Sequence, residues 1–248
     1  YSDGTESALL KKIEACKDRS VFSEEFFPFA DWSEEYHLCR DRGNLFRIFD
    51  EELKPGTRIF ELGAGCGAIT RFLGEKGCHV TAVEGAPARA SIAKARCADL
   101  PGVQVFCANF QDLDFSADSF DLVTLIGVFE YSALFFEGSS PFEKSLALAR
   151  RHMSEKSLLV LAIENQLGLK YFNGMKEDHL GKRFFGINGL YQMGKKTAQT
   201  FTRRTLSEMV HAAGLKNQRF YYPFHDYKIQ KLLLKEEAFR CDPLKPNQ

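Results

Sequence analysis

The stretch at residues 59–70, Ile-Phe-Glu-Leu-Gly-Ala-Gly-Cys-Gly-Ala-Ile-Thr, constrains the fold of this chain more than any other. An apolar run ends at an acidic residue, Glu61, and a glycine-rich turn then opens into helix-forming sequence. Glycine permits a positive φ angle and lets a ligand approach the main chain closely. Open α/β sheets bind nucleotides at the carboxyl ends of their parallel strands, where such a turn belongs. The turn therefore predicts an α/β fold with a nucleotide site beside it.

Further elements follow the turn in order. A second apolar run, residues 80–83, ends at Glu84, and an acid at the end of a second strand suits a ribose diol. A third short strand, residues 103–106, leads to Asn109 and Phe110. Residues 119–131, Ser-Phe-Asp-Leu-Val-Thr-Leu-Ile-Gly-Val-Phe-Glu-Tyr, predict a fourth strand and the loop after it.

These four motifs, in this order, resemble those of class I S-adenosylmethionine-dependent methyltransferases. The resemblance implies a Rossmann-like fold with a mostly parallel, seven-stranded sheet, and S-adenosyl-L-methionine (SAM) as cofactor. It implies that Glu84 grips the ribose and that the adenine meets the side chain of Asn109 and the backbone N–H of Phe110. The full set of cofactor-binding residues that it implies is Glu61, Gly63, Ala64, Gly65, Gly67, Glu84, Gly85, Asn109, Phe110 and Gly127.

A nicotinamide cofactor is the competing interpretation of the first motif. Gly63, Gly65 and Ala68 also satisfy the G-x-G-x-x-A pattern of dinucleotide-binding folds. That pattern is weak by itself, so the later motifs decide, and they favour SAM.

Composition narrows the class of partner. The chain has 248 residues, with 33 basic and 33 acidic side chains, and so lacks the basic excess of a typical nucleic-acid binder. Its seven cysteines include no C-x-x-C pair, which favours a reducing cytoplasm over a disulfide scaffold or a zinc cluster. No membrane span or signal peptide is recognisable. The first residue is Tyr1, so we expect a fragment of a larger protein or a trimmed chain.

The chain divides into two parts by pattern. Residues 1–54 predict an N-terminal helical cap, with helical spacing at 5–18 and 38–53, and residues 55–248 predict the SAM-binding domain. Strands are expected near 57–62, 79–83, 103–107, 120–126, 157–163, 218–222 and 228–234, the last antiparallel. Helices are expected near 67–76, 86–97, 141–153 and 202–213, the last capped by Thr202 and stopped by Gly214. Residues 164–200 lack periodicity and predict a substrate-binding insertion after strand five.

Motifs of the second half extend the resemblance to about residues 33–235. They are Tyr36-His37-Leu38 with Arg42, the run 164–172, the run 177–179 (Glu-Asp-His), the run 200–203, and the run 222–228. Together they resemble a bacterial methyltransferase subfamily found with, or fused to, glycosyltransferases of surface-polysaccharide (O-antigen type) synthesis. The resemblance implies a sugar or glycan hydroxyl as acceptor and a glycosyltransferase as partner. His225 stands where that pattern has a proline.

A sugar hydroxyl must shed a proton to attack the methyl group, so a positioned base is expected. His179 is the first candidate, with Asp178 beside it to orient the ring, and His37 is the second. Glu130, after strand four, falls where the family lines the transfer site. The residues 177–179 are consecutive and cannot easily converge on one ion, so we predict no metal. Candidate substrate-binding residues are Glu164, Asn165, Lys170, Tyr171, Tyr191 and Arg203.

Other functions share the same motifs. The acceptor could instead be a small metabolite, a phosphate or a protein side chain. The domain could also bind SAM without transferring its methyl group and act as an interaction module. The sequence identifies neither the position methylated nor the oligomeric state.

Overall fold

The computed structural model describes residues 4–239, except 114, 118, 193, 194 and 225. His225 therefore lies outside the described residues. The strands are β1 (Arg58–Leu62), β2 (His79–Glu84), β3 (Val103–Cys107), β4 (Phe120–Ile126), β5 (Met153–Ala162), β6 (Tyr221–Phe224) and β7 (Leu232–Lys235). The α-helices are α1 (Glu6–Ala15), α2 (Trp32–Leu38), α3 (Ala68–Glu75), α4 (Pro87–Arg96), α5 (Ser132–Phe135), α6 (Pro141–Arg151), α7 (Leu169–Phe172) and α8 (Arg203–Ala212). The 3₁₀ helices are η1 (Glu24–Phe26), η2 (Arg40–Phe49), η3 (Phe110–Asp112), η4 (Phe129–Tyr131) and η5 (Glu236–Phe239).

Five strands form one parallel sheet in the order β3-β2-β1-β4-β5. The chain runs outward from β1 in one direction and then returns to continue from β4, so the order reverses between these two central strands. Ligands of open α/β sheets bind outside the carboxyl ends of the strands at such a reversal. The predicted α/β, Rossmann-like architecture is confirmed.

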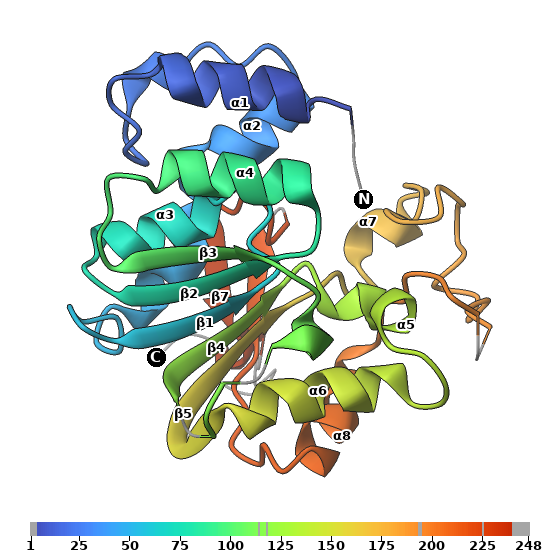
Figure 1. The fold of residues 1–248 in the computed structure, drawn as a ribbon. Helices are drawn as coiled ribbons and strands as arrows, with labels where there is room; N and C mark the ends of the chain where they lie inside the picture. The colour runs from blue at the N-terminus through green and yellow to red at the C-terminus, as the bar shows by residue number, and fades with distance from the viewer. Residues whose placement is uncertain (1–3, 114, 118, 193–194, 225, 240–248) are drawn as a thin grey trace, which may run out of the picture.

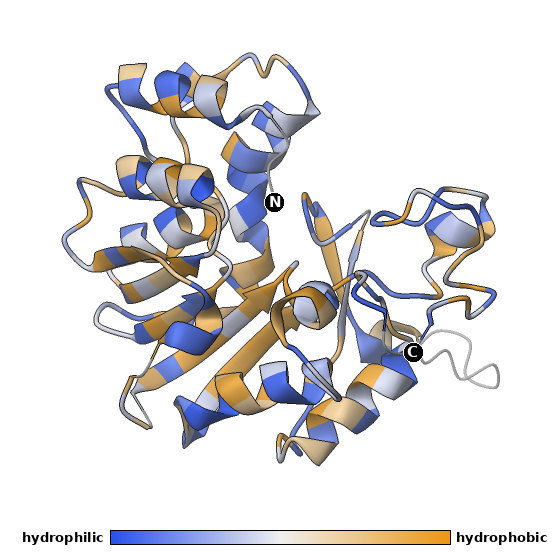
Figure 2. Ribbon diagram, turned by 45° about the vertical axis from the view of Figure 1, so that its right-hand side comes forward, coloured by the Kyte–Doolittle hydropathy of each residue, from blue (hydrophilic) through white to orange (hydrophobic). Residues whose placement is uncertain are grey.

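Helices cover both faces of this sheet, as Figure 1 shows: α3 and α4 lie on one side, and α6 and α8 on the other. Successive residues of a strand point to opposite faces, and β1 illustrates this. Ile59 packs with η2 and α3 in one core, whereas Phe60 packs with α6 in the other. Figure 2 shows the result, with apolar strands between helices that carry both apolar and polar residues.

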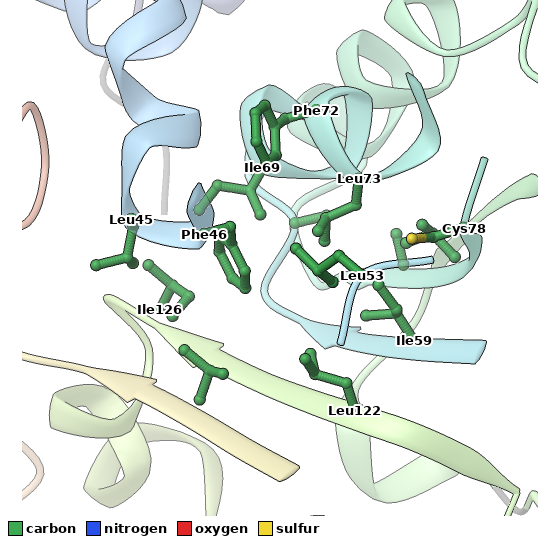
Figure 3. Packing of buried hydrophobic residues seen from close by; sticks show 14 of the residues in the cluster. Leu45, Phe46, Leu53, Ile59, Ile69, Phe72, Leu73, Cys78, Leu122 and Ile126 are labelled. Atoms are coloured by element: carbon green, nitrogen blue, oxygen red, sulfur yellow. The ribbon is translucent and has the colours of Figure 1, made fainter. Parts of the chain in front are cut away.

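The N-terminal cap is held by its own apolar contacts. Leu9 and Ile13 of α1 and Leu38 of α2 are buried together with Ile92 of α4. In Figure 3, Phe46 of η2 lies against the α3 side chains above β1 and β4. The predicted helix at 38–53 is therefore a 3₁₀ helix over Arg40–Phe49.

The prediction of seven strands in one sheet is wrong. In the described residues the main sheet has five strands, and β6 and β7 form a separate antiparallel pair. Each of these strands has four residues, and β6 contains Pro223. Proline has no N–H to donate, so a strand this short cannot sustain a ladder on both sides. Strands β6 and β7 thus form a hairpin beside the sheet rather than two more of its strands.

The first four strands and α3, α4, α6 and α8 agree with the prediction to within two residues, whereas β5 begins four residues earlier than predicted, at Met153. Thr202 caps α8 by accepting a hydrogen bond from the backbone N–H of Thr205, and Gly214 after it has a positive φ of 87°. Between β5 and α8 the chain forms mostly turns and bends with the short helix α7, as the missing periodicity at 164–200 predicted. No helix in the described ranges is long and apolar enough to cross a bilayer.

Candidate functional site

A cleft runs along the carboxyl edge of the sheet. On one side it is lined by the glycine-rich loop after β1, by Glu84 after β2 and by Asn109 after β3. On the other side it is lined by Glu164 after β5 and by His179 of the insertion. The topology therefore brings together the segments that were predicted from the sequence to bind the cofactor and the acceptor.

The loop after β1 has no room for side chains at two of its glycines. Gly63, Gly65 and Gly67 have φ angles of 80°, 55° and 78°, a region that favours glycine. A Cβ atom on Gly63 would lie 2.2 Å from Cγ2 of Val128, and one on Gly67 would lie 2.9 Å from the Cα atom of Ala93. The glycines thus allow the loop to pass close to the β4 loop and to α4.

Glu84 holds this loop in place. One carboxylate oxygen accepts a hydrogen bond from the backbone N–H of Gly65 and the other accepts one from Ala86, both at 2.8 Å. A carboxylate has further lone pairs, so these contacts leave acceptor capacity toward the cleft. Glu84 therefore stands where the prediction puts the ribose, and it also braces the loop.

Glu61 is almost fully buried and is hydrogen-bonded within the protein. Its side chain accepts a hydrogen bond from the hydroxyl of Thr70 at 2.6 Å, and the residue is 3% exposed. Burial raises the pKa of Glu61 to about 7, against the opposing effects of the Thr70 hydrogen bond and the positive charge of Arg42. Arg42 enters from η2 of the cap and also lines the cleft.

The remaining predicted cofactor residues also reach the cleft. Asn109 lines it at the start of η3, where its amide donates to Asp112 at 3.1 Å, and Phe110 is buried edge-on against Phe135. Ala64, Gly85 and Gly127 lie along the same edge. A Cβ atom on Gly127 would meet the hydroxyl of Tyr227 at 2.7 Å, so this glycine makes room for a buried phenol.

On the acceptor side, His179 is held by three partners. Its Nδ1 lies 3.0 Å from the hydroxyl of Tyr131, and its Nε2 lies 3.3 Å from Oε2 of Glu164. Its backbone N–H donates to Glu177 at 3.0 Å. Burial lowers the pKa of His179, but the Glu164 carboxylate outweighs it, so the net shift is upward.

Glu164 is the centre of the charge network. Its other oxygen, Oε1, pairs with the ammonium of Lys228, and its side chain is 1% exposed. Burial would raise the pKa of Glu164, but His179 and Lys228 overcome it and lower the pKa. Neighbouring Glu130 shifts in the opposite direction, because burial and the charge of Glu164 both raise its pKa. Its Oε2 has no hydrogen-bond partner in the described residues.

Further charged side chains surround the ion pair of Glu164 and Lys228. The ammonium of Lys170 contacts Asp178 at 2.8 Å and Asp226 at 2.9 Å, and the hydroxyl of Tyr171 donates to Asp178. The prediction that Asp178 orients the His179 ring is therefore wrong, because Asp178 binds Lys170 and Tyr171 instead. Tyr131 and Glu164 orient the ring.

Other candidates make structural contacts. His37 of α2 lines the cleft but is buried edge-on to Tyr36, and its carbonyl accepts from Arg96 at 2.5 Å. The hydroxyl of Tyr191 bonds to Glu177 and Thr200, and so braces the insertion.

The last two substrate candidates also make structural contacts. Asn165 is exposed and accepts from the N–H of Leu167 at 2.9 Å, which shapes the turn that begins the insertion. Arg203 pairs with Glu236 at 2.7 Å and stacks on Phe220, which ties α8 to the hairpin rather than to the His179 cluster.

Sequence reasoning missed two side chains of the site, Tyr131 and Arg42, which it noted only as parts of motifs. The only available signal was position, because Tyr131 ends the fourth motif and Arg42 follows the run Tyr36-His37-Leu38. Their roles depend on partners far away in the chain, which a single sequence does not disclose.

Two groups of side chains could hold a metal ion by their spacing. One is Glu130, Glu164 and His179, and the other is Glu164, Asp178 and Asp226. Lys170 and Lys228 already balance the second group electrostatically. The expectation of no metal stays a prediction.

Comparison with known proteins now bears on this geometry. The family model described as a methyltransferase domain matches residues 59–136, which include the glycine-rich loop, Glu84, Asn109 and Gly127. Residues 59–136, about a third of the chain, therefore resemble a methyltransferase domain. S-adenosyl-L-methionine is its cofactor, and the four motifs predicted to bind it lie at the carboxyl edge of the sheet.

Individual relatives are distant. A cyclopropane-fatty-acyl-phospholipid synthase from Escherichia coli (strain K12) is 24% identical over 149 residues, covering 57% of this chain and 37% of that enzyme. The chain thus spans little more than a third of that relative.

Solved structures share the fold of the methyltransferase domain. A SAM-dependent methyltransferase from Methanosarcina mazei aligns with a TM-score of 0.55 at 17% identity, over 75% of this chain and 93% of that one. A 1,6-didemethyltoxoflavin N1-methyltransferase from Burkholderia thailandensis, solved with S-adenosylhomocysteine, gives 0.52 at 16% identity, over 79% and 76%. These likenesses concern the fold, and the acceptor has to be argued from the site.

Proposed function

We propose that this methyltransferase domain transfers the methyl group of SAM to a hydroxyl of a sugar or glycan in surface-polysaccharide synthesis. The observation that carries the proposal is the buried pair of His179 and Glu164 at the cleft, 3.3 Å apart. A hydroxyl acceptor must lose a proton, and a histidine held by a carboxylate is suited to receive it. The identity of the acceptor as a glycan rests on the resemblance of the second-half motifs.

The chain's own residues would act as follows. The glycine-rich loop and Glu84 hold the cofactor, while the acceptor enters between Gly127 and the insertion. SAM bound there would supply an electrophilic methyl group, which the acceptor oxygen would take as it loses its proton. His179 receives the proton, and Glu164 stabilises the resulting imidazolium. Alignment of the two reactants contributes a further large part of the rate.

Several related expectations belong to the same proposal. A glycosyltransferase, fused or associated, is the partner that would present the glycan. A cytoplasmic location fits the six cysteines of the described ranges, all of which are free thiols. Asp178, His37 and Glu130 remain candidates for supporting roles, and Lys170 and Tyr171 line or brace the acceptor side.

The test is methyl transfer from deuterium-labelled SAM to a panel of sugar nucleotides, oligosaccharides, amines and phospholipids. We expect release of S-adenosylhomocysteine with at least one saccharide, and a labelled methyl ether on that saccharide by mass spectrometry. Transfer to amines or lipids alone would contradict the glycan acceptor. Cofactor binding without release of S-adenosylhomocysteine in any mixture would support the non-catalytic alternative.

A further inference from the structure

The protonation pattern of His179 can be worked out from its partners. Glu164 is a carboxylate that already binds the Lys228 ammonium, and a carboxylate can only accept hydrogen bonds. The Nε2 atom that faces it must therefore carry a hydrogen. In the neutral ring the lone pair then lies on Nδ1, which points at the hydroxyl of Tyr131 at 3.0 Å.

Both ring nitrogens of His179 are thus occupied, and its side chain is only 7% exposed. A hydroxyl of the acceptor cannot reach Nδ1 directly without displacing Tyr131. A base that is enclosed in this way reaches its substrate through the group that covers it. Here the covering group is a phenol, which can accept one proton while it donates another.

Tyr131 stands at the right place for that task. It ends η4, directly after the loop that follows β4, and its backbone N–H donates to the carbonyl of Val128 at 3.0 Å. Val128 in turn packs on Gly63 of the cofactor loop. Tyr131 lines the cleft together with Gly63 and Gly127, and it lies edge-on to the His179 ring with centroids 5.2 Å apart. Its ring therefore bridges the cofactor side and the base.

The other polar groups near His179 cannot carry a proton from the acceptor to its ring. Lys228 is an ammonium engaged by Glu164 and has no lone pair to accept a proton. Asp178 is bound by Lys170 and by the hydroxyl of Tyr171. The Oε2 atom of Glu130 is buried and out of contact with the open cleft.

We propose that Tyr131 is a catalytic residue that takes the proton of the acceptor hydroxyl and passes its own proton to Nδ1 of His179. This rests on the proposed hydroxyl acceptor. The oxygen–hydrogen bond of the acceptor breaks as its oxygen bonds to the methyl carbon, and the sulfur keeps the electron pair of the broken carbon–sulfur bond. Tyr131 ends as a neutral phenol again, and the proton rests on His179 between Tyr131 and Glu164. Such a relay makes Tyr131 and His179 act as one unit.

The experiment compares Tyr131→Phe, His179→Ala and the double variant in the full chain. The probe is the saccharide that yields S-adenosylhomocysteine with the wild-type protein. Tyr131→Phe keeps the ring and removes only the hydroxyl, so we expect KM and SAM affinity within about threefold. We expect kcat to fall roughly 10²-fold or more, the usual contribution of a general acid–base group. The double variant should lose little more than His179→Ala alone, because residues of one unit are not additive.

A matched control is Tyr221→Phe, because Tyr221 lies in β6 of the hairpin and its ring packs on Phe49 of η2. It should leave kcat unchanged. A kcat for Tyr131→Phe within threefold of wild type, or losses that multiply in the double variant, would overturn the relay.

A second measurement needs no acceptor. In ¹⁵N-histidine spectra of the protein with SAM, His179 should appear as the Nε2–H tautomer, and the Nδ1 resonance should shift in Tyr131→Phe. An Nδ1–H tautomer would refute the relay even if methyl transfer to a saccharide is found. If spectra agree but no acceptor is methylated, the proposed function fails and the relay fails with it.

Discussion

The two sides of the cleft are built in different ways. The cofactor side is mostly backbone: three glycines with positive φ angles, a run of N–H groups, and Glu84 that fixes two of them. The acceptor side is made of charged side chains that come from three separate segments, and Lys228 reaches Glu164 across 64 residues. Backbone geometry is set locally, whereas a charge network depends on how distant segments meet. The two sides should therefore respond differently to substitution.

The largest expected effect belongs to the base on the acceptor side. His179→Ala should lower kcat by roughly 10²- to 10⁴-fold, because it removes the group that receives the proton. SAM affinity should stay nearly unchanged, since the cofactor contacts lie on the other side. Isothermal titration calorimetry with SAM measures the affinity, and a turnover assay measures kcat. Wild-type turnover in this variant would remove His179 from the base role.

Glu164→Gln should be the most destabilising of the single changes. It removes the negative charge between His179 and Lys228, and it leaves the half-buried Lys228 ammonium with only the longer contacts to Asp178 and Asp226, at 3.7 and 3.8 Å. Breaking a buried pair costs up to about 3–5 kcal/mol. The matched control is Glu137→Gln, which breaks an exposed pair with Lys196 and should cost under about 1 kcal/mol. Equal urea-denaturation midpoints for the two variants would contradict the buried network.

Glu84→Ala tests the cofactor side, where the expected effect is on binding. It removes the acceptor for two backbone N–H groups and, on the prediction that Glu84 binds the ribose, a direct contact with the cofactor. A hydrogen bond to a charged group contributes about 1.5–3 kcal/mol, so SAM affinity should fall roughly 10- to 100-fold. Asp121→Ala is the control, because its carboxylate pairs with Arg58 near the opposite end of the sheet. Calorimetry showing equal SAM affinity in both variants would mean that Glu84 does not contact the cofactor.

The same contrast explains what the sequence could predict. Gly63, Gly65 and Glu84 were found because strand–turn–helix patterns are local, and the bounds of β1 to β4 agree with the structure to within one residue for the same reason. The role of Asp178 was misjudged because adjacency in sequence does not imply contact. Its partners are Lys170 and Tyr171 of α7 and, at 3.7 Å, Lys228 after β6. Hairpin β6–β7 was placed in the main sheet because apolar runs predict strands without specifying their neighbours.

The smallest effect is a pH dependence with opposite signs for rate and stability. The pKa of His179 lies above 6.5 in the folded chain, because the effects of Glu164, Glu130 and Glu177 outweigh burial. Relay through Nδ1 requires the neutral ring, so turnover should fall up to tenfold per pH unit below that raised pKa. The folded state binds the proton more tightly than the unfolded chain does. His179 therefore stabilises the fold fully below pH 6.5, and this contribution is lost as the pH rises through the folded pKa.

The contribution of His179 to the pH dependence of stability can be isolated by comparison with His179→Gln, whose side chain cannot titrate. The unfolding free energy of the variant is subtracted from that of wild type at each pH. The difference in unfolding free energy between wild type and variant should shrink from acidic to alkaline pH, over the same window in which wild-type turnover rises. Tyr131 also contacts the ring and Lys228 binds the other oxygen of Glu164, but neither supplies negative charge at neutral pH, so the carboxylates set the direction. If the midpoint of the rise in turnover with pH lay at or below pH 6.5, Glu164 would not be ionised beside the ring. The assignment of Nε2 as the nitrogen that carries the hydrogen would then lose its basis.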